Sequence, residues 1–418
     1  MLRRAFVLLI STLGMAACQV LPGPPGPYGA PYPQYAPPPG PLPPNAPPPG
    51  PRVAILLPLS GPRPQLAQAM LKAAQLALGG PGNPSLDPRD TRGTPEGAAR
   101  AAHEALAAGD GLILGPLTGP ETAAVAPIAR RAGVGVLAFS NDAAQAQPGV
   151  WVLGITPGQQ VRRLVSAAQT RGRTELAGLF PENEFGRAMS EALVQNAGLA
   201  GLPPPAIQTY RPGTQSVAAA LRGLLGPAEP GIPGSEGSPP PPPGAEAPST
   251  EQPPSPPPAP PPFNGLVLAD TGGRLAEIAS LLKSHNIAHP EVQIMGPALW
   301  AAPSSGSGQV AEAWYAAPDP AARNQFDAAY RAKYGGPAPG LADLAYDAAA
   351  IARVAATDTG GFSVTALAQP QGYNGADGLL ALLPDGHVRR ALALFAVKAG
   401  GGGELIEPAP ASLMEPGV

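Results

Sequence analysis

Short apolar runs alternate with stretches of helical periodicity along most of this 418-residue chain. The run from Val53 to Leu57 is apolar at every position, which is typical of a parallel strand buried on both faces. The next segment, Gln65 to Leu78, has the apolar spacing of an amphipathic helix. Because strands that alternate with helices form parallel sheets with helices on both faces, the fold class is predicted as α/β with doubly wound sheets.

The alternation continues through two blocks, residues 52–226 and 263–400. Further strands are predicted at residues 111–114, 134–139, 150–153, 176–180, 207–210, 266–268 and 292–295. Further helices are predicted at residues 95–108, 121–132, 184–197, 216–225 and 274–286. More than about 300 ordered residues exceed what one hydrophobic core usually holds. Two lobes are therefore expected.

Prolines are concentrated in two tracts, although proline (62) and glycine (53) together exceed a quarter of the whole chain. Residues 19–51 are predicted to be a disordered tether, whose polyproline II form would reach up to roughly 100 Å. Residues 227–262 are predicted to be a disordered Pro-rich insert in a surface loop. Residues 401–418 are expected to form a flexible tail.

The N-terminus has the features of an export signal. A basic pair at residues 3–4 precedes an apolar segment at 5–13, which is too short to span a bilayer stably. Residues 15–18 read Met-Ala-Ala-Cys and resemble the lipobox of bacterial lipoproteins, in which the cysteine is acylated. We therefore predict a lipoprotein signal peptide over residues 1–18, with Cys18, the sole cysteine, lipidated. The alternative is an ordinary signal peptide with an incidental cysteine.

Several classes of function have no support in the sequence. The net charge is −3 and no Lys/Arg cluster has interleaved aromatics, which argues against a nucleic-acid surface. The chain contains no Gly-x-Ser-x-Gly elbow, P-loop or His-Glu-x-x-His motif. A Gly-x-Gly-x-x-Ala sequence at 133–138 runs from a helix into a strand, the reverse of a dinucleotide fingerprint, so Gly133 is interpreted as a helix stop. His285 and His289 are four residues apart, but no cysteine or obvious acidic partner completes a metal site. We predict a protein that is not an enzyme and has no catalytic residue, metal or cofactor.

Loops that follow the carboxyl ends of strands are where open α/β sheets bind ligands. Polar residues follow four of the predicted strands, and free N–H groups at helix N-termini would suit an anion. The alternative is that these residues serve only as helix caps and turn residues. The candidate ligand residues are Ser60, Thr118, Ser140, Asn141, Asp142, Phe185 and Asp270.

A series of longer segments points to one family. They are VAILLPLSGP from residue 53, GLILGPLTGPETAAVAPIARRAGVGVLAFSND from 111, PENEFG from 181, FDAAYRAKYGG from 326, and LAYDAAAIARVA from 344 with YNGADGLLALLPDGHVRRALALFAV from 373. In this order they resemble the Leu/Ile/Val-type receptors, which have the type I periplasmic-binding fold. The resemblance covers nearly all of residues 52–398 apart from the Pro-rich insert.

This resemblance implies two doubly wound Rossmann-like lobes, joined by three crossings of the chain, with a ligand cleft between them. The periplasmic-binding domain would span residues 52–400. The first lobe would hold residues 52–154 and 300–365, and the second lobe would hold 155–299 and 366–400.

The amino-acid site of the family carries over poorly. Thr118 matches a hydroxyl that binds the ligand carboxylate, but residues 143–144 are alanines near the position of a second one. The family's ammonium-binding acid follows a Met-Gly-Pro-like turn, where this chain has Ala298. Without that acid a ligand ammonium would lack its partner, which should cost several kcal/mol in a closed site. Asp142 or Asp270 could replace it.

A lipid-anchored branch of the family, the penicillin-binding protein activators, is similar in its lipid, its tether and its altered amino-acid site. The leading hypothesis is therefore a non-enzymatic activator whose partner is a penicillin-binding protein that synthesises peptidoglycan. The alternative is a solute-binding receptor for amino acids or related small molecules, whose partner is an ABC permease. Gln19 follows Cys18 where an Asp would mark retention in the inner membrane, so the resemblance implies a periplasmic protein anchored at the inner leaflet of the outer membrane.

Overall fold

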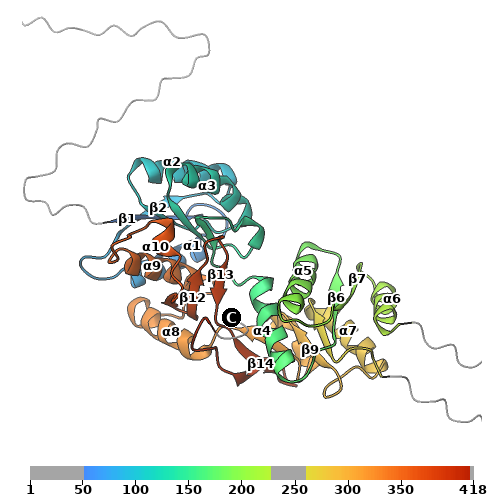
Figure 1. Ribbon diagram of the computed structural model, residues 1–418. Helices are drawn as coiled ribbons and strands as arrows, with labels where there is room; N and C mark the ends of the chain where they lie inside the picture. Colours follow the sequence, from blue (N-terminus) through green and yellow to red (C-terminus); the bar gives the residue numbers. More distant parts are fainter. Residues whose placement is uncertain (1–50, 227–259, 415–418) are drawn as a thin grey trace, which may run out of the picture. The chain divides into compact units, whose positions relative to one another are not determined.

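The computed structural model describes residues 51–226 and 260–414. The predicted signal peptide with Cys18, the tether except Pro51 and the insert except residues 260–262 lie outside these residues. Strands and helices alternate through the described chain, and two sheets with helices on both faces form two lobes (Figure 1). The predicted α/β fold class is confirmed.

The first lobe is built on a five-stranded parallel sheet in the order β2-β1-β3-β4-β5. Its strands are β1 (Arg52–Leu57), β2 (Ser85–Asp90), β3 (Leu112–Leu114), β4 (Gly135–Ala138) and β5 (Val150–Val152). The strands β3, β4 and β5 are buried at every residue, as their continuous apolar runs predict. The edge strand β2 is mostly polar and contains Pro88, which an edge tolerates. Because Leu86 is the one large apolar residue of this strand, the sequence shows no apolar run that would have predicted it.

Helices cover both faces of this sheet. They are α1 (Pro64–Ala77), α2 (Pro95–Ala107), α3 (Gly119–Ala132), α8 (Pro320–Tyr334), α9 (Ala342–Ala355) and the short α10 (Val364–Leu367), with a 3-10 turn η1 (Ala143–Gln145). Figure 1 shows α2 and α3 on one face and α1 and α9 on the other. Thr94 caps α2 by accepting a hydrogen bond from the Gly97 N–H (3.0 Å), and Gly133 ends α3 with a φ of 69° that glycine adopts without strain. Both helix boundaries were predicted.

The second lobe is built on a seven-stranded sheet in the order β15-β14-β10-β9-β8-β6-β7. Its strands are β6 (Leu176–Pro181), β7 (Ala206–Tyr210), β8 (Gly265–Leu268), β9 (Gln293–Gly296), β10 (Trp314–Ala317), β14 (Ala393–Val397) and β15 (Gly403–Glu407). The strands from β7 to β10 run parallel, whereas β14 and β15 are antiparallel additions. Residues 403–407, part of the predicted flexible tail, thus form an edge strand.

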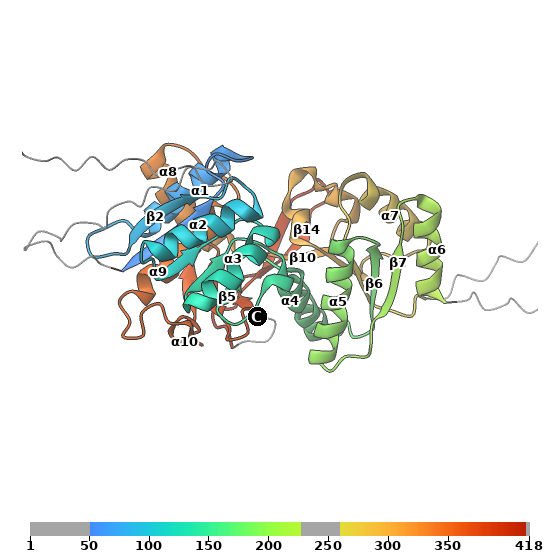
Figure 2. The ribbon, with the colours of Figure 1, turned by 90° about the horizontal axis from the view of Figure 1, so that it is seen from above.

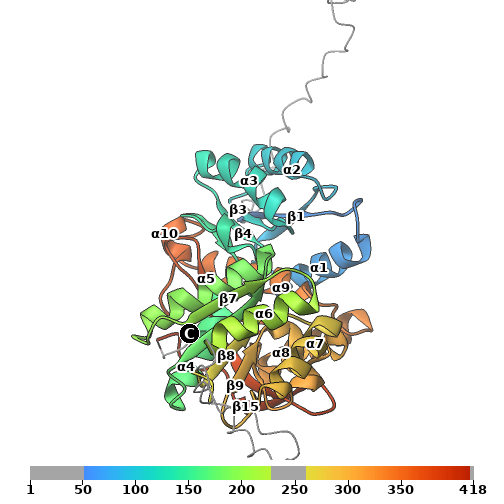
Figure 3. The same ribbon diagram turned by 90° about the vertical axis from the view of Figure 1, so that its right-hand side faces the viewer.

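Helices α4 (Pro157–Thr170) and α5 (Glu184–Leu199) pack on one face of this sheet, and α6 (Thr214–Leu225) and α7 (Gly272–Ser284) on the other. Figures 2 and 3 show α6 and α7 side by side. The sequence did not predict α4, because its buried face includes Gln160 and Arg163 and therefore lacks a clean apolar stripe.

The boundaries predicted for the two lobes are wrong after residue 300. The strand β10 lies in the second sheet between β9 and β14. All four of its residues are buried in this position, which suits its apolar sequence. Conversely, β11 (Tyr373–Gly375), β12 (Gly378–Leu382) and β13 (Val388–Arg390) form a separate antiparallel sheet that packs on α9 in the core of the first lobe. The chain crosses between the lobes after β5, β10 and β13, the three crossings that the resemblance implies, and after β15 it returns to the first lobe, where Leu413 packs against Ala381.

Three 3-10 turns connect β9 to β10: η2 (Ala298–Ala301), η3 (Pro303–Ser305) and η4 (Ser307–Val310). They enclose Trp300, whose side chain is fully buried in the second lobe. Across residues 51–226 and 260–414, no helix has the combined length and apolarity that crossing a membrane requires.

Candidate functional site

The candidate residues follow the carboxyl ends of neighbouring strands. Ser60, Thr118 and the segment 140–142 follow β1, β3 and β4, which are adjacent in the first sheet. Phe185 and Asp270 follow β6 and β8, which are adjacent in the second sheet. The topology therefore brings the residues together in two groups, one at the carboxyl edge of each sheet.

The hydrogen-bond donors of Ser60 are both used within the protein. Its hydroxyl and its N–H donate to the two carboxylate oxygens of Asp90 at the end of β2. Burial would raise the pKa of Asp90, but the hydrogen bonds from Ser60 and the Arg92 N–H outweigh it and lower that pKa. Ser60 therefore stabilises a turn of the first lobe and has no donor left for a ligand.

Thr118 is likewise engaged, as the N-cap of α3. Its hydroxyl donates to Glu121 Oε2 (2.7 Å), its N–H donates to the same oxygen (3.1 Å), and the Glu121 N–H donates back to the hydroxyl (3.4 Å). This is a complete capping box, which fixes the start of the helix. The helix-cap interpretation of Thr118 is thus the one that the hydrogen bonds support.

The loop after β4 differs from the loops of Ser60 and Thr118, because not all of its polar side chains are engaged within the protein. The Asp142 N–H donates to the hydroxyl oxygen of buried Ser140 (3.0 Å), and the Asp142 carboxylate accepts from the Ala144 N–H (3.0 Å) and the Gln145 amide (3.0 Å). Asn141 is exposed, and its side chain makes no hydrogen bond to the described residues. Among the described residues of the first lobe, Asn141 keeps its side-chain donors and acceptors free, and the Ser140 hydroxyl accepts a hydrogen bond but donates none.

The second lobe contributes an aromatic ring and a carboxyl group. Phe185, in the first turn of α5, is partly buried against the core beneath that helix. Asp270 is half-buried, and its Oδ2 atom is shielded from solvent with no hydrogen-bond partner among the described residues. Burial raises the pKa of Asp270 to about 6, and nearby Arg274 only partly opposes that rise.

Gln160, which sequence reasoning missed, fixes the turn at Ala298, the position where the family has its ammonium-binding acid. The buried side chain of Gln160 accepts a hydrogen bond from the Ala298 N–H (2.7 Å) and donates to the Thr156 carbonyl (3.3 Å). Gln160 is a polar residue at a buried position of α4, so it adds nothing to the apolar periodicity from which a helix is predicted. Ala298 therefore presents neither a carboxylate nor a free N–H.

An open cavity of about 440 Å³ lies elsewhere, between α1 and α8 of the first lobe. Leu59, Lys72 and Tyr330 line it, and none of the candidate residues does. The Tyr330 hydroxyl donates to a backbone carbonyl of α1, so the ring holds the two helices together. We assign the candidate site to the sheet edges, where unpaired polar groups remain.

A family model described as "Periplasmic binding protein" matches residues 51–402. The chain belongs to the periplasmic binding protein family. Membership implies a periplasmic location, and these proteins typically bind solutes without catalysing a reaction. No curated protein sequence matches the chain.

Solved structures of periplasmic binding proteins share the fold. A putative branched-chain amino acid ABC transporter from Rhodospirillum rubrum is 18% identical with a TM-score of 0.65, covering 85% of this chain and 100% of its own. A branched-chain amino acid ABC transporter periplasmic ligand-binding protein from Burkholderia xenovorans is 14% identical with a TM-score of 0.61, covering 88% and 97%. A substrate-binding protein from Desulfitobacterium hafniense, complexed with Leu, is 16% identical with a TM-score of 0.56, covering 85% and 100%.

This periplasmic binding protein also contains a buried ion pair beside the first interlobe crossing. Arg390 in β13 donates to Asp347 of α9 (3.0 Å) and to the Leu153 carbonyl (3.2 Å), and both charged side chains are fully buried. Burial raises the pKa of Asp347 to about 6, although Arg390 acts in the opposite direction. Asp347 also accepts from the Ala376 N–H (2.5 Å), so the pair joins α9, β13 and the loop after β11.

Arg323 of α8 extends this network. It contacts Asp377 (3.0 Å) and Asp343 (3.3 Å), which lie on the loop after β11 and on α9. Burial and the charge of Asp377 raise the pKa of Asp343 well above its usual value. Sequence reasoning missed the network, although charged residues within the alanine-rich α9 sequence were an available signal.

Proposed function

We propose that this protein is the solute-binding receptor of an ABC importer. The observation that carries the proposal is the presence of unpaired polar groups at the carboxyl edges of both sheets, Asn141 in one lobe and Asp270 in the other. Carboxyl edges of parallel sheets are where such folds bind ligands, and the ligand would lie in the cleft between the lobes. The similar proteins from Rhodospirillum rubrum and Burkholderia xenovorans, described as ABC transporter components, support the same assignment.

Branched-chain amino acids are not the expected ligand. The donors of Ser60 and Thr118 are engaged within the protein, so neither is free to bind a ligand carboxylate. Breaking their hydrogen bonds to reach a ligand would offset the binding energy gained. We expect isothermal titration calorimetry to detect no binding of leucine, isoleucine or valine at micromolar affinity. Micromolar or tighter binding of any of the three would contradict this account of the first lobe.

A second candidate function is activation of a penicillin-binding protein that synthesises peptidoglycan. The internal engagement of Ser60 and Thr118, together with Ala298 in place of an acid, favours it, because a regulator does not need an amino-acid site. The predicted lipid anchor and tether suit a stationary regulator anchored at the outer membrane. The receptor is preferred because the same fold also keeps the unpaired carboxyl of Asp270.

Affinity purification from solubilised cell envelope separates these two functions. The full chain, tagged at its C-terminus, is cross-linked in cells and recovered with its partners. Recovery of an ABC permease is expected. Recovery of a transpeptidase–glycosyltransferase without a permease would reject the receptor and support the activator.

The lipid anchor at Cys18 remains a proposal with its own test. Replacing Cys18 by serine is expected to release the protein into the soluble periplasmic fraction, because acylation requires the thiol and no other anchor is predicted. Membrane fractionation followed by immunoblotting measures the shift. Unchanged membrane association of Cys18→Ser would show that the lipoprotein interpretation is wrong.

A further inference from the structure

The carboxyl group of Asp270 lacks the partners that a buried carboxylate normally has. Its Oδ2 atom accepts no hydrogen bond from the described residues, although it is shielded from water. A carboxylate in this setting loses part of its hydration without gaining the hydrogen bonds that would compensate for that loss. Because the residue is only half-buried, its other side remains open to a ligand from solvent.

The loop that carries Asp270 is held in place by its backbone. The Trp300 indole N–H donates to the Asp270 carbonyl oxygen (2.8 Å), and Gly306 lies against Gly272. The hydroxyls of Ser305 and Ser307 donate to the Trp300 carbonyl, which fixes this segment in turn. The carboxyl group is therefore held on a supported loop while its side chain stays unpaired.

Positive charge near this carboxyl is scarce. Arg274, one turn into α7, is the cation that acts on Asp270, but its guanidinium pairs with Glu277 (2.7 Å). The residues of η2, η3 and η4, from 298 to 310, include no ionisable side chain. Nor does β9 contribute one, since its four residues are Gln, Ile, Met and Gly. Among the described residues, Arg274 is therefore the cation that acts on Asp270, and its guanidinium is shared with Glu277.

We propose that Asp270 binds the cationic group of the ligand, a primary ammonium or a guanidinium. The inference rests on the proposed receptor function and names its ligand class: organic amines that need no carboxylate. A metal ion is a poor fit, because no group of three or more His, Cys, Asp or Glu side chains suited to one occurs among the described residues. An ammonium supplies the donors and the positive charge together.

Binding of such a cation should depend on pH. The pKa of Asp270, raised to about 6, means that the free protein carries a neutral carboxyl below that pH. A cationic ligand selects the ionised form, so binding is coupled to loss of a proton there. We expect the affinity for an amine to be constant above about pH 7 and to fall by up to about tenfold per pH unit below about pH 6.

The test uses the purified full chain and matched pairs of compounds. Putrescine is compared with butanediol, and leucinamide with isocaproamide and isocaproate, by thermal denaturation and calorimetry at pH 8 and pH 5. The variant Asp270→Asn removes the charge at nearly constant shape. Asp385→Asn, at an exposed carboxyl in the turn between β12 and β13, is the matched control.

We expect an amine to raise the melting temperature of the wild type and of Asp385→Asn. We expect its affinity for Asp270→Asn to be at least tenfold lower than its affinity for the wild type. Binding that is confined to the neutral or anionic analogues, or that Asp270→Asn leaves unchanged, would overturn this inference and leave the receptor function standing. Binding of none of these compounds would count against both.

Stability of the free protein provides an independent measurement. Without ligand, Asp270→Asn is expected to melt at a higher temperature than the wild type at pH 8, because it removes an ionised carboxyl that lacks donors. The difference should shrink at pH 5, where Asp270 is protonated. A lower melting temperature for Asp270→Asn at pH 8 would show that the carboxylate stabilises the fold, and would overturn the inference.

Discussion

Replacing Arg390 by methionine is expected to lower the free energy of unfolding by about 3–5 kcal/mol, the range for breaking one partner of a buried ion pair. The pair with Asp347 is fully buried, so methionine would leave a carboxyl group with no counter-charge in the core of the first lobe. Urea denaturation measures the loss. It should be larger at pH 8 than at pH 5, because the raised pKa of Asp347 lets the carboxyl take up a proton at the lower pH.

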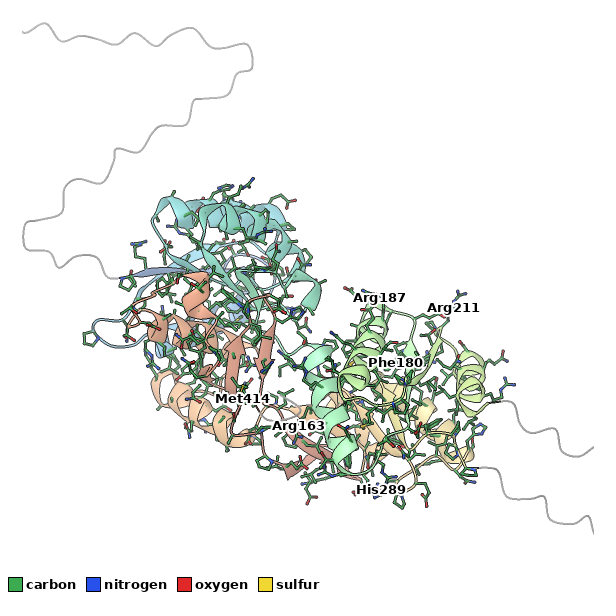
Figure 4. The ribbon with its side chains drawn as sticks, in the orientation of Figure 1. Arg163, Phe180, Arg187, Arg211, His289 and Met414 are labelled. Atoms are coloured by element: carbon green, nitrogen blue, oxygen red, sulfur yellow. The ribbon has the colours of Figure 1, made fainter. Side chains whose placement is uncertain are left out.

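Two controls separate this effect from general loss of an arginine. Arg187→Met breaks an exposed pair with Glu191 on α5 and should lower the free energy of unfolding by about 0–1 kcal/mol. Figure 4 shows Arg187 and Arg211 extending outward from the second lobe. Adding Asp347→Leu to Arg390→Met removes the orphaned carboxyl and should restore much of the stability. A loss below about 1 kcal/mol for Arg390→Met would show that the pair is not buried as described.

Replacing Trp300 by alanine is expected to cost about 3–5 kcal/mol and to abolish ligand binding. The ring is fully buried in the second lobe and lies against Gly296, where even one added methyl group would clash with it. Its indole N–H also holds the Asp270 carbonyl, so the cavity left by alanine would release the loop that carries the carboxyl group. Chemical denaturation and calorimetry measure the two effects.

Trp300→Phe is the matched variant for this prediction. Phenylalanine keeps most of the buried area but loses the hydrogen bond to Asp270. A smaller loss of stability is therefore expected, together with weakened binding from a less firmly held loop. Unchanged ligand affinity in both variants would contradict the role assigned to this segment.

Much of the fold could be predicted from apolar periodicity. The strand from Val53 to Leu57 and the helix from Gln65 to Leu78 lie within one residue of the observed β1 and α1. Elements whose buried faces are polar could not be predicted this way. The helix α4 buries Gln160 and Arg163, and β2 is a polar edge strand.

The placement of the candidate residues after strand ends could be predicted, whereas their hydrogen-bond partners could not. Strand ends placed Ser60, Thr118 and Asp270 at the sheet edges, since every parallel strand ends on the same side. Whether a hydroxyl is free depends on partners such as Asp90, which is distant in sequence from Ser60. Contacts of this kind, like that between Asp347 and Arg390, have no local signature in the sequence.

Native mass spectrometry of the full chain purified from its own periplasm, under conditions that retain bound molecules, is the most direct test of the receptor function. The account predicts one small molecule per chain, carrying an amine or guanidinium, that is released on denaturation. It also predicts that the molecule is lost from Asp270→Asn and retained by Asp385→Asn. A wild-type chain that carries no small molecule, and gains none when incubated with the small-molecule fraction of that periplasm, would contradict the account.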